Sequence, residues 1–478
     1  MQEHAARALN TAEVLGASYA DIRIERRESQ SLTVKNGHVD ALSDDVSQGF
    51  GVRVVVDGAW GFASSALIED SEIDRVVALA VAIARASATT LSTAVNLGEP
   101  VRSRGSYQTP VVRDPFAVPL AEKLELLLDA DRAMRSVAGI AITESGLEAL
   151  RLTKLFANTE GSLVEQVITE SGGGIEAMAV SDDEVQKRSY PNSFGRQQGT
   201  AGYEFVEAMD LVGNAARIAE EAVQLLTADV CPSETTTIVL DPTQAALQVH
   251  ESCGHPIELD RVFGTEAAYA GTSFLTTDKL RNFQYGSDQV TIVADATVPT
   301  ALGTFGFDDE GVPAQRTVIV DQGRFVNYLT SRETAAAFGE PSNGTMRASG
   351  WNRIPLIRMT NINLMPGAWS LEDLIADTDR GIYMQTNKSW SIDDRRLNFQ
   401  FGVEIAWEIR GGKLTRMLRN ATYTGITPRF WGNCDAVGRD WAVWGTPNCG
   451  KGQPGQVAHV GHGAAATRIR NVQVGVMQ

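Results

Sequence analysis

Apolar positions in the first part of the chain alternate between helical and strand-like patterns. Residues 3–17 and 68–87 repeat apolar side chains at the spacing of an amphipathic helix, whereas residues 21–28 alternate as a half-buried strand does. The mixture predicts an α/β unit over residues 1–100.

Two dipeptides predict how the strands of this unit are connected. Asn-Gly at residues 36–37 and Asp-Gly at residues 57–58 each separate two strand-like runs. Such dipeptides favour tight hairpin turns, because both central residues of the turn take a positive φ. We therefore expect an antiparallel sheet.

A second α/β unit is predicted over residues 115–228. It follows a stretch rich in proline, arginine and serine at residues 98–116, which is typical of a linker. Its predicted elements are two helices and two strands, at residues 117–137, 205–227, 150–158 and 162–172.

From residue 233 to residue 478, strand-like runs are joined by long loops and helical windows are rare. One of the few helical windows opens after a strand, where Asp241 or Thr243 is a suitable N-cap. We therefore predict an α+β protein. Its N-terminal α/β half has antiparallel sheets, and its C-terminal domain is β-rich, sandwich-like or barrel-like, and carries this helix.

Length and charge narrow the function classes. A chain of 478 residues with 43% hydrophobic content is long enough for two or three domains. The net charge is −17 and no Lys/Arg-rich run occurs, so we expect neither a nucleic-acid nor a membrane partner. The N-terminus lacks the apolar core of a signal peptide, and the apolar run at residues 76–84 is too short to span a bilayer. A cytoplasmic location is expected.

The predicted helix in the third unit carries the segment HESCGH, which begins at His250 and ends at His255. In the common HExxH zinc motif the histidines are four residues apart and share one helix face. Here they are five apart, and at about 100° per residue the second imidazole points about 140° away from the first. The helix must therefore break or bulge inside the motif. Gly254 and Pro256 would permit this, since glycine tolerates helix-end φ values and proline cannot continue the ladder.

A catalytic zinc site normally has three protein ligands and one open position. Two histidines are therefore insufficient, and the spacing in the sequence does not choose the third ligand. The candidates are Cys449, Cys434, His459, His462 and Glu258.

Five segments in the same order resemble the TldD/PmbA family of metallopeptidases, and specifically its zinc-bearing, TldD-like branch. They are GFGVRVVVDGAWGFAS, HESCGHPIELD, GTFGFDDEGVPAQRT, RIPLIRMTNI and NCGKGQPG. The resemblance implies that His250, His255 and Cys449 hold Zn²⁺ and that Glu251 is the catalytic base. PmbA-like partner subunits typically lack these residues.

The implied ligand set has a chemical consequence. Two neutral imidazoles and one thiolate leave zinc with a net charge of +1, one unit below a site of three histidines, so water there is acidified less. A neighbouring base becomes more important. We expect Glu251 to take a proton from the attacking water and to return it to the leaving amine.

The resemblance further implies a dimer, either of two identical chains or with a PmbA-like subunit, that admits unfolded or small peptides. The implied function is peptide maturation and degradation.

Two alternatives to this function stay open. One is a non-catalytic binding or regulatory protein of the gyrase-modulator type, with a closed, structural zinc site. The other is a zinc hydrolase that acts on different substrates, such as an amidase.

Two groups of charged residues have open roles. The acidic run Asp308, Asp309 and Glu310 is expected either on solvated surface or in a loop at the site, where it could meet the substrate's amino end. Three arginines could form surface ion pairs or bind a peptide carboxylate. They are Arg347, Arg353 and Arg358.

Overall fold

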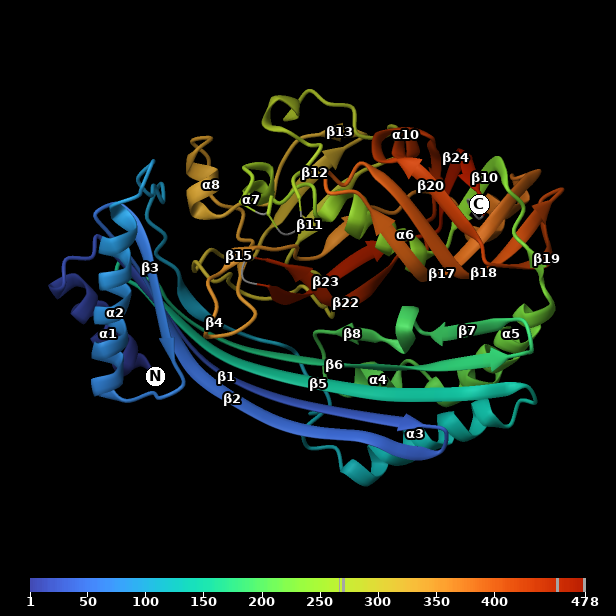
Figure 1. The fold of residues 1–478 in the computed structure, drawn as a ribbon, viewed down its shortest axis with the longest axis horizontal. Helices are drawn as coiled ribbons and strands as arrows, with labels where there is room; N and C mark the ends of the chain where they lie inside the picture. The colour runs from blue at the N-terminus through green and yellow to red at the C-terminus, as the bar shows by residue number, and fades with distance from the viewer. Residues whose placement is uncertain (266, 269–270, 453–454, 476–478) are drawn as a thin grey trace.

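A long, curved N-terminal sheet partly wraps a β-rich C-terminal domain (Figure 1). The computed structural model describes residues 1–265, 267–268, 271–452 and 455–475. The architecture is mixed α+β, which confirms the predicted fold class. Within the described ranges, no helix is both long and apolar enough to cross a bilayer.

The described residues of the N-terminal half form one eight-stranded sheet in the order β3-β2-β1-β5-β6-β4, with β7 and β8 also paired to β6. Strands from the predicted units 1–100 and 115–228 are therefore joined side by side in a single sheet. The strands are β1 (Tyr19–Lys35), β2 (His38–Val56), β3 (Ala59–Ser65), β4 (Arg104–Gln108), β5 (Ile140–Asn158), β6 (Leu163–Val180), β7 (Val185–Tyr190) and β8 (Gln197–Gly199).

Both predicted hairpin turns are present. Asn36 and Gly37 have φ values of 49° and 81°, and Asp57 and Gly58 have φ values of 52° and 79°. These turns connect β1 to β2 and β2 to β3 in antiparallel register. The predicted linker also contributes to the sheet, because β4 pairs in parallel with β6.

Helices bury apolar faces against the two ends of this sheet (Figure 1). At one end, α1 and α2 form a core with residues of β1 and β2. At the other end, α3 and α5 pack on β5 and β6. The helices of this half are α1 (Gln2–Val14), α2 (Asp70–Ala88), α3 (Leu120–Arg135), the 3-10 turn η1 (Ser193–Gly195), α4 (Glu204–Glu207) and α5 (Leu211–Thr227).

The C-terminal domain is built on a closed barrel of five strands. The ring closes because β17 pairs with β10 on one side and with β18 on the other. Its strands are β10 (Glu234–Leu240), β17 (Arg380–Ile392), β18 (Asn398–Arg410), β20 (Thr422–Ile426) and β24 (Thr467–Val474).

A hairpin of β22 (Ala442–Lys451) and β23 (Gln456–Ala464) lies between the barrel and the N-terminal sheet (Figure 1). Helix α6 (Pro242–Val249) packs against β17 and β23. The remaining elements are β9 (Asp229–Val230), the π-helical turn η2 (His250–Gly254), α7 (Leu259–Val262), η3 (Thr277–Lys279), β11 (Ile292–Asp295), β12 (Arg316–Asp321), β13 (Arg324–Phe325), α8 (Arg332–Ala336), β14 (Met346–Arg347), β15 (Leu356–Ile357), β16 (Ile362–Leu364), α9 (Leu371–Ala376), β19 (Lys413–Arg419), α10 (Thr427–Gly432) and β21 (Cys434–Val437).

The acidic run at residues 308–310 is buried between the two halves of the molecule, rather than on solvated surface. Its charges meet cations on the sheet: Lys154 of β5 forms an ion pair with Asp309, and Arg53 of β2 lies 3.5 Å from Glu310. Carboxylates can be buried when they are paired and hydrogen-bonded in this way. The run therefore fixes the C-terminal domain against the sheet.

Candidate metal centre

Helix α6 leads directly into the histidine motif. The side chain of Asp241 caps the helix by accepting a hydrogen bond from Gln244 N at 2.9 Å, and Pro242 occupies the first turn. After Val249 the backbone changes to the π-helical turn η2, in which His255 N donates to His250 O at 3.2 Å. That bond spans five residues.

The π-helical turn explains how histidines five residues apart face one point. A wider turn reduces the angle between residues separated by five positions, and the two ring centroids lie 5.0 Å apart. The predicted bulge is confirmed. The predicted role of Gly254 is not, because its φ is not positive. Glycine is required there by lack of space instead, because a Cβ at residue 254 would lie 2.1 Å from Met359 Sδ.

Cys449 joins the two histidines from the β22 strand. Its Sγ lies 3.7 Å from His255 Nε2, and the ligand atoms of His250, His255 and Cys449 all lie within 4.8 Å of one another. Zinc bonds of about 2.3 Å to sulfur and about 2.0 Å to nitrogen, at tetrahedral angles, separate the sulfur and the nitrogen by about 3.5 Å. The buried trio therefore fits a zinc-sized ion.

The sheet of the N-terminal half helps to hold the strand that carries Cys449. The side chain of Gln197, on β8, donates to Val443 O at 2.9 Å and accepts from Gly445 N at 2.8 Å. This amide thus binds the backbone of β22 at two points. Cys449 belongs to the segment NCGKGQPG at residues 448–455, of which Gln453 and Pro454 lie outside the described residues.

Two of the other candidate ligands contact the far side of the imidazoles. Glu258 Oε2 lies 3.1 Å from His255 Nδ1, and His462 Nε2 lies 2.7 Å from His250 Nδ1. The contact with Glu258 leaves His255 Nε2 facing Cys449, and the contact with His462 engages Nδ1 of His250 and leaves its Nε2 available to a metal. Partners of this kind fix ring orientation and tautomer in metal sites.

The remaining two candidates lie elsewhere. His459 Nδ1 contacts Glu170 Oε2 at 2.5 Å, on β6 of the N-terminal sheet. Cys434 is packed in the core of the C-terminal domain, where burial raises the pKa of its thiol to about 12. Neither residue belongs to the group that could hold a metal.

The protonation states suit a cation. Burial lowers the pKa of His250, and it lowers the pKa of His255 well below its ordinary value, so both imidazoles are neutral at physiological pH. Burial alone would raise the pKa of the Cys449 thiol, but the contacts with His255 and Arg358 outweigh it and the pKa lies below its ordinary value. Because His255 is neutral, the positive charge that favours the thiolate is that of Arg358. A thiolate and two neutral imidazoles are the forms that bind zinc.

Glu251 lies beside this trio and is buried. Its Oε2 accepts a hydrogen bond from Arg396 Nη1 at 2.6 Å. Arg396 lies between β17 and β18, far from the motif in sequence, and no local pattern in the sequence points to it. The carboxylate is thereby held on the side of the motif that faces a cavity.

That cavity has a volume of about 610 Å³ and opens onto the candidate centre. Both halves of the molecule line it: Asn192, Phe194 and Arg196 come from the loop around η1, and residues 444–450 come from β22. Phe194 makes an edge-to-face contact with Trp390 across the two halves, with ring centroids 6.2 Å apart. The pocket is large enough for several residues of an extended peptide.

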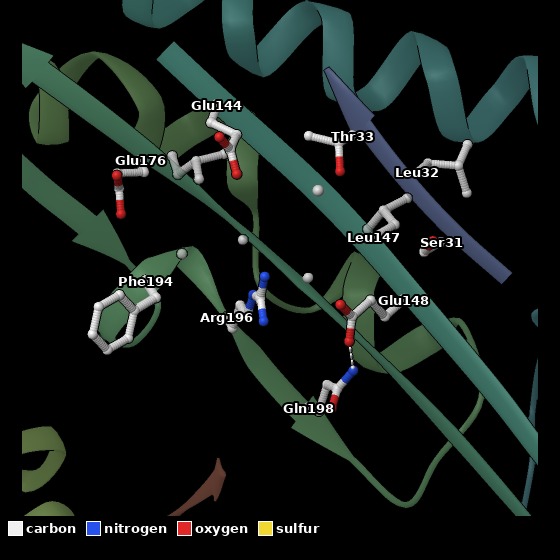
Figure 2. Close-up of a pocket in the computed structure, with 15 residues that line it drawn as sticks. Ser31, Leu32, Thr33, Glu144, Leu147, Glu148, Glu176, Phe194, Arg196 and Gln198 are labelled. Atoms are coloured by element: carbon white, nitrogen blue, oxygen red, sulfur yellow. Dashed lines mark hydrogen bonds between the residues drawn. The ribbon is translucent and has the colours of Figure 1, made fainter. Parts of the chain in front are cut away.

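A second, smaller cavity lies against β1, β5 and β6 and is shown in Figure 2. Its volume is about 50 Å³, and its lining contains no histidine or cysteine among the described residues. Phe194 and Arg196 line both cavities, so the η1 loop lies between them. This loop sits directly on β6, where a Cβ on Gly174 would lie 2.1 Å from Gly195 O.

Two of the three arginines with open roles contact the backbone around the centre. Arg358 is 1% exposed, and its Nη2 lies 3.2 Å from Cys449 Sγ. Arg347 Nη1 donates to Met359 O and to His459 O, at 2.9 and 2.7 Å. The expectation of surface ion pairs is therefore wrong for both of these side chains.

Models of three domains of one family match nearly the whole chain. They are PmbA/TldA metallopeptidase domain 1 at residues 20–84, the central domain at residues 113–228, and the C-terminal domain at residues 233–476. A metalloprotease from Methanocaldococcus jannaschii is 32% identical over 453 residues, which cover 94% of this chain and 95% of that protein. A metalloprotease TldD homolog from Haemophilus influenzae is 27% identical, covering 96% and 92%.

Solved structures share the fold. TldE from Thermococcus kodakarensis has a TM-score of 0.77 at 16% identity and covers 99% of this chain and 100% of its own. A Thermotoga maritima protein described as a candidate modulator of a DNA gyrase has a TM-score of 0.80 at 19% identity, with 99% of each chain covered. The domain matches and the curated relatives show that the chain belongs to the TldD/PmbA family of metallopeptidases.

Proposed function

We propose that this chain is a cytoplasmic, zinc-dependent peptidase that hydrolyses unfolded or small peptides. The observation that carries the proposal is a buried His250, His255 and Cys449 trio with Glu251 beside it, at one wall of a cavity of about 610 Å³. All four cysteines are free, which fits a reducing compartment.

Zinc is the metal that this donor set favours. Mixed imidazole and thiolate donors in a tetrahedral arrangement suit Zn²⁺, whereas Mg²⁺ and Ca²⁺ prefer oxygen ligands. His250 Nε2, His255 Nε2 and Cys449 Sγ would be the protein ligands. When bound, zinc supplies a Lewis acid that acidifies water and polarises the scissile carbonyl.

Glu251 performs the proton transfers. Its carboxylate takes a proton from the attacking water and later delivers that proton to the amine of the leaving peptide. Arg396 holds the carboxylate through one oxygen, Oε2, and so limits its rotation. Burial of Glu251 also keeps bulk water from competing for the proton.

The hairpin strand β22 offers a binding surface for an extended peptide. In the described residues its only strand partner is β23. Gln197 occupies the β22 backbone at Val443 and Gly445, and residues 446–450 line the cavity beyond that point. A substrate added along this edge would be held by main-chain hydrogen bonds, with little dependence on its side chains. Folded proteins could not present such a strand. We further propose a dimer, with a second copy or with a PmbA-like subunit.

The test is a cleavage assay with an unfolded casein-like substrate, with and without a chelator, on the wild type and Cys449→Ala. We expect cleavage that stops with chelator and returns with Zn²⁺, and reduced zinc content and activity in Cys449→Ala. A folded control protein should resist cleavage. Equal cleavage of folded and unfolded substrates, or a Cys449→Ala variant with normal zinc, would contradict the proposal.

The same assay distinguishes a peptidase from the alternative, a non-catalytic protein with structural zinc. A structural site is closed by four protein ligands. Among the described residues, the group that could hold a metal contains three side chains, and the nearby His462 faces the outer nitrogen of His250. The geometry therefore favours a site with one position left for water. Metal-bound protein without any cleavage would support the alternative.

A further inference from the structure

Among the described residues, Arg358 is the cation in contact with Cys449 Sγ, the candidate sulfur ligand. Its Nη2 lies 3.2 Å from Cys449 Sγ, and the same nitrogen donates to Cys449 O. Nη1 lies 3.3 Å from Gln456 O on the neighbouring strand. Both strands of the β22–β23 hairpin thus hold a guanidinium that is 1% exposed.

The nearest carboxylate does not neutralise this guanidinium by close pairing. Glu258 Oε1 lies 3.9 Å from Arg358 Nε, which is longer than a hydrogen bond. Oε2 of the same Glu258 lies 3.1 Å from His255 Nδ1 and 3.6 Å from Lys451 Nζ. The hydrogen bonds of Arg358 therefore go to Cys449 and to the backbone of Gln456, and Glu258 contributes only a longer ion pair.

A charge placed there has a defined chemical effect. A thiolate donates more electron density to zinc than an imidazole does, and so weakens the Lewis acid by comparison with a site of three histidines. A charge-assisted N–H···S hydrogen bond draws density back onto the sulfur. Hydrogen bonds to ligating sulfur atoms are a known means by which proteins tune metal centres.

We propose that Arg358 is a positioning residue that tunes the metal through Cys449, offsetting the lower net charge of a two-histidine, one-cysteine site. The inference rests on the ligand set proposed above. Arg358 fixes Sγ at its distance from His255 and withdraws charge from the sulfur. Glu258 joins Arg358 to His255, so the two ligands that come from different elements share one buried network.

Cobalt(II) substitution tests this without relying on catalysis, because a thiolate bound to cobalt gives a sulfur-to-metal charge-transfer band. We would compare wild type, Arg358→Met and Arg358→Lys. Lys451→Met is the matched control. Lys451 is a buried cation beside Glu258, and its polar contacts in the described part of the chain are with Glu258, Asp260 and Ile357 O, not with the sulfur of Cys449.

We expect the band to move to longer wavelength in Arg358→Met, because the sulfur lone pairs rise in energy without the hydrogen bond. Arg358→Lys should show a smaller shift in the same direction, and Lys451→Met should leave the band in place. Zinc affinity of Arg358→Met should fall by about 10–100-fold, the usual effect of losing an outer partner of a ligand.

The outcomes separate this inference from the proposed function. A wild type that binds cobalt without a sulfur charge-transfer band shows that the ligand set itself is wrong. A band that is present in wild type but unmoved in folded Arg358→Met overturns the role of Arg358 alone. Should Arg358→Met fail to fold, Arg358→Lys decides, and an unmoved band there equally overturns it.

Discussion

Glu251 and Arg396 form a partly buried ion pair at the wall of the large cavity, with Arg396 Nη1 2.6 Å from Glu251 Oε2. The two residues come from elements almost 150 positions apart in the sequence, the π-helical turn and the connection between β17 and β18. Arg396 has a φ of 62°, so its backbone conformation is one that side chains rarely adopt. The pair therefore depends on the correct closure of the barrel.

Removing this pair should slow cleavage more than it weakens substrate binding. In Arg396→Leu the Glu251 carboxylate loses its orientation, and a small misplacement of a reacting group can cost about 100-fold in rate. We expect kcat to fall by that order with a small change in KM, and Arg396→Lys to recover part of it. Steady-state kinetics measure both. The control is Arg395→Leu, because Arg395 is exposed and adjacent in the sequence. An equal fall of kcat in that variant would contradict a specific role for Arg396.

The pH dependence of zinc binding should follow a single proton. Burial keeps the pKa of His250 below 6.5 and that of His255 well below it, so above that pH neither imidazole releases a proton on binding. The pKa of Cys449 lies below 9.0, against burial, and with His255 neutral the cation that favours its thiolate is Arg358. Apparent affinity should rise about tenfold per pH unit while Cys449 is protonated, and level off before pH 9. Titration calorimetry in several buffers measures the protons released, and release of two or three per zinc above pH 7 would refute this.

The space at Gly254 makes a prediction about stability. Alanine there would place a Cβ 2.1 Å from Met359 Sδ, and overpacking of a buried site costs about 1–3 kcal/mol. Met359→Ala leaves a cavity and is itself destabilising. In urea unfolding, the double variant should lose less free energy of unfolding than the sum of the two single variants. Strictly additive losses would show that the two positions do not compete for space.

The contact between the sheet and the C-terminal domain also depends on paired charges. Lys154→Met leaves Asp309 buried without its closest cation, which should destabilise the protein by about 3–5 kcal/mol. Lys35→Met removes an exposed pair with Glu144 and should cost less than about 1 kcal/mol. Thermal unfolding measures the loss of stability in each of the two variants. Similar losses would mean that the buried pair does not hold the halves together.

Local features of the fold were predictable from the sequence. Asn36-Gly37 and Asp57-Gly58 adopt the positive φ values that their types favour, and Asp241 caps the helix before the histidines. Longer-range features were not. For the run at residues 308–310 the sequence left both a solvated surface and a loop at the site open, because its cations, such as Lys154, lie on strands far away in the sequence. Burial depends on those distant partners.

The candidate site shows the same division. The spacing of His250 and His255 required a helix irregularity, and the structure has a π-helical turn there. The choice of Cys449 over other candidates came from family resemblance, because β22 meets the turn only through the tertiary fold. Arg396 carried no sequence signal, and for Arg358 the sequence indicated only a surface ion-pair donor or a carboxylate binder. Isolated arginines are common, and these two contact partners that are distant in the sequence.

One measurement on Glu251→Gln separates metal binding from chemistry. The substitution keeps the size of the side chain and removes its ability to accept a proton as a base. We expect the purified variant to contain close to one zinc per chain, as the wild type should, while cleavage of an unfolded peptide falls to background. Zinc at the wild-type level together with retained cleavage would contradict the role of Glu251 and the peptidase mechanism built on it.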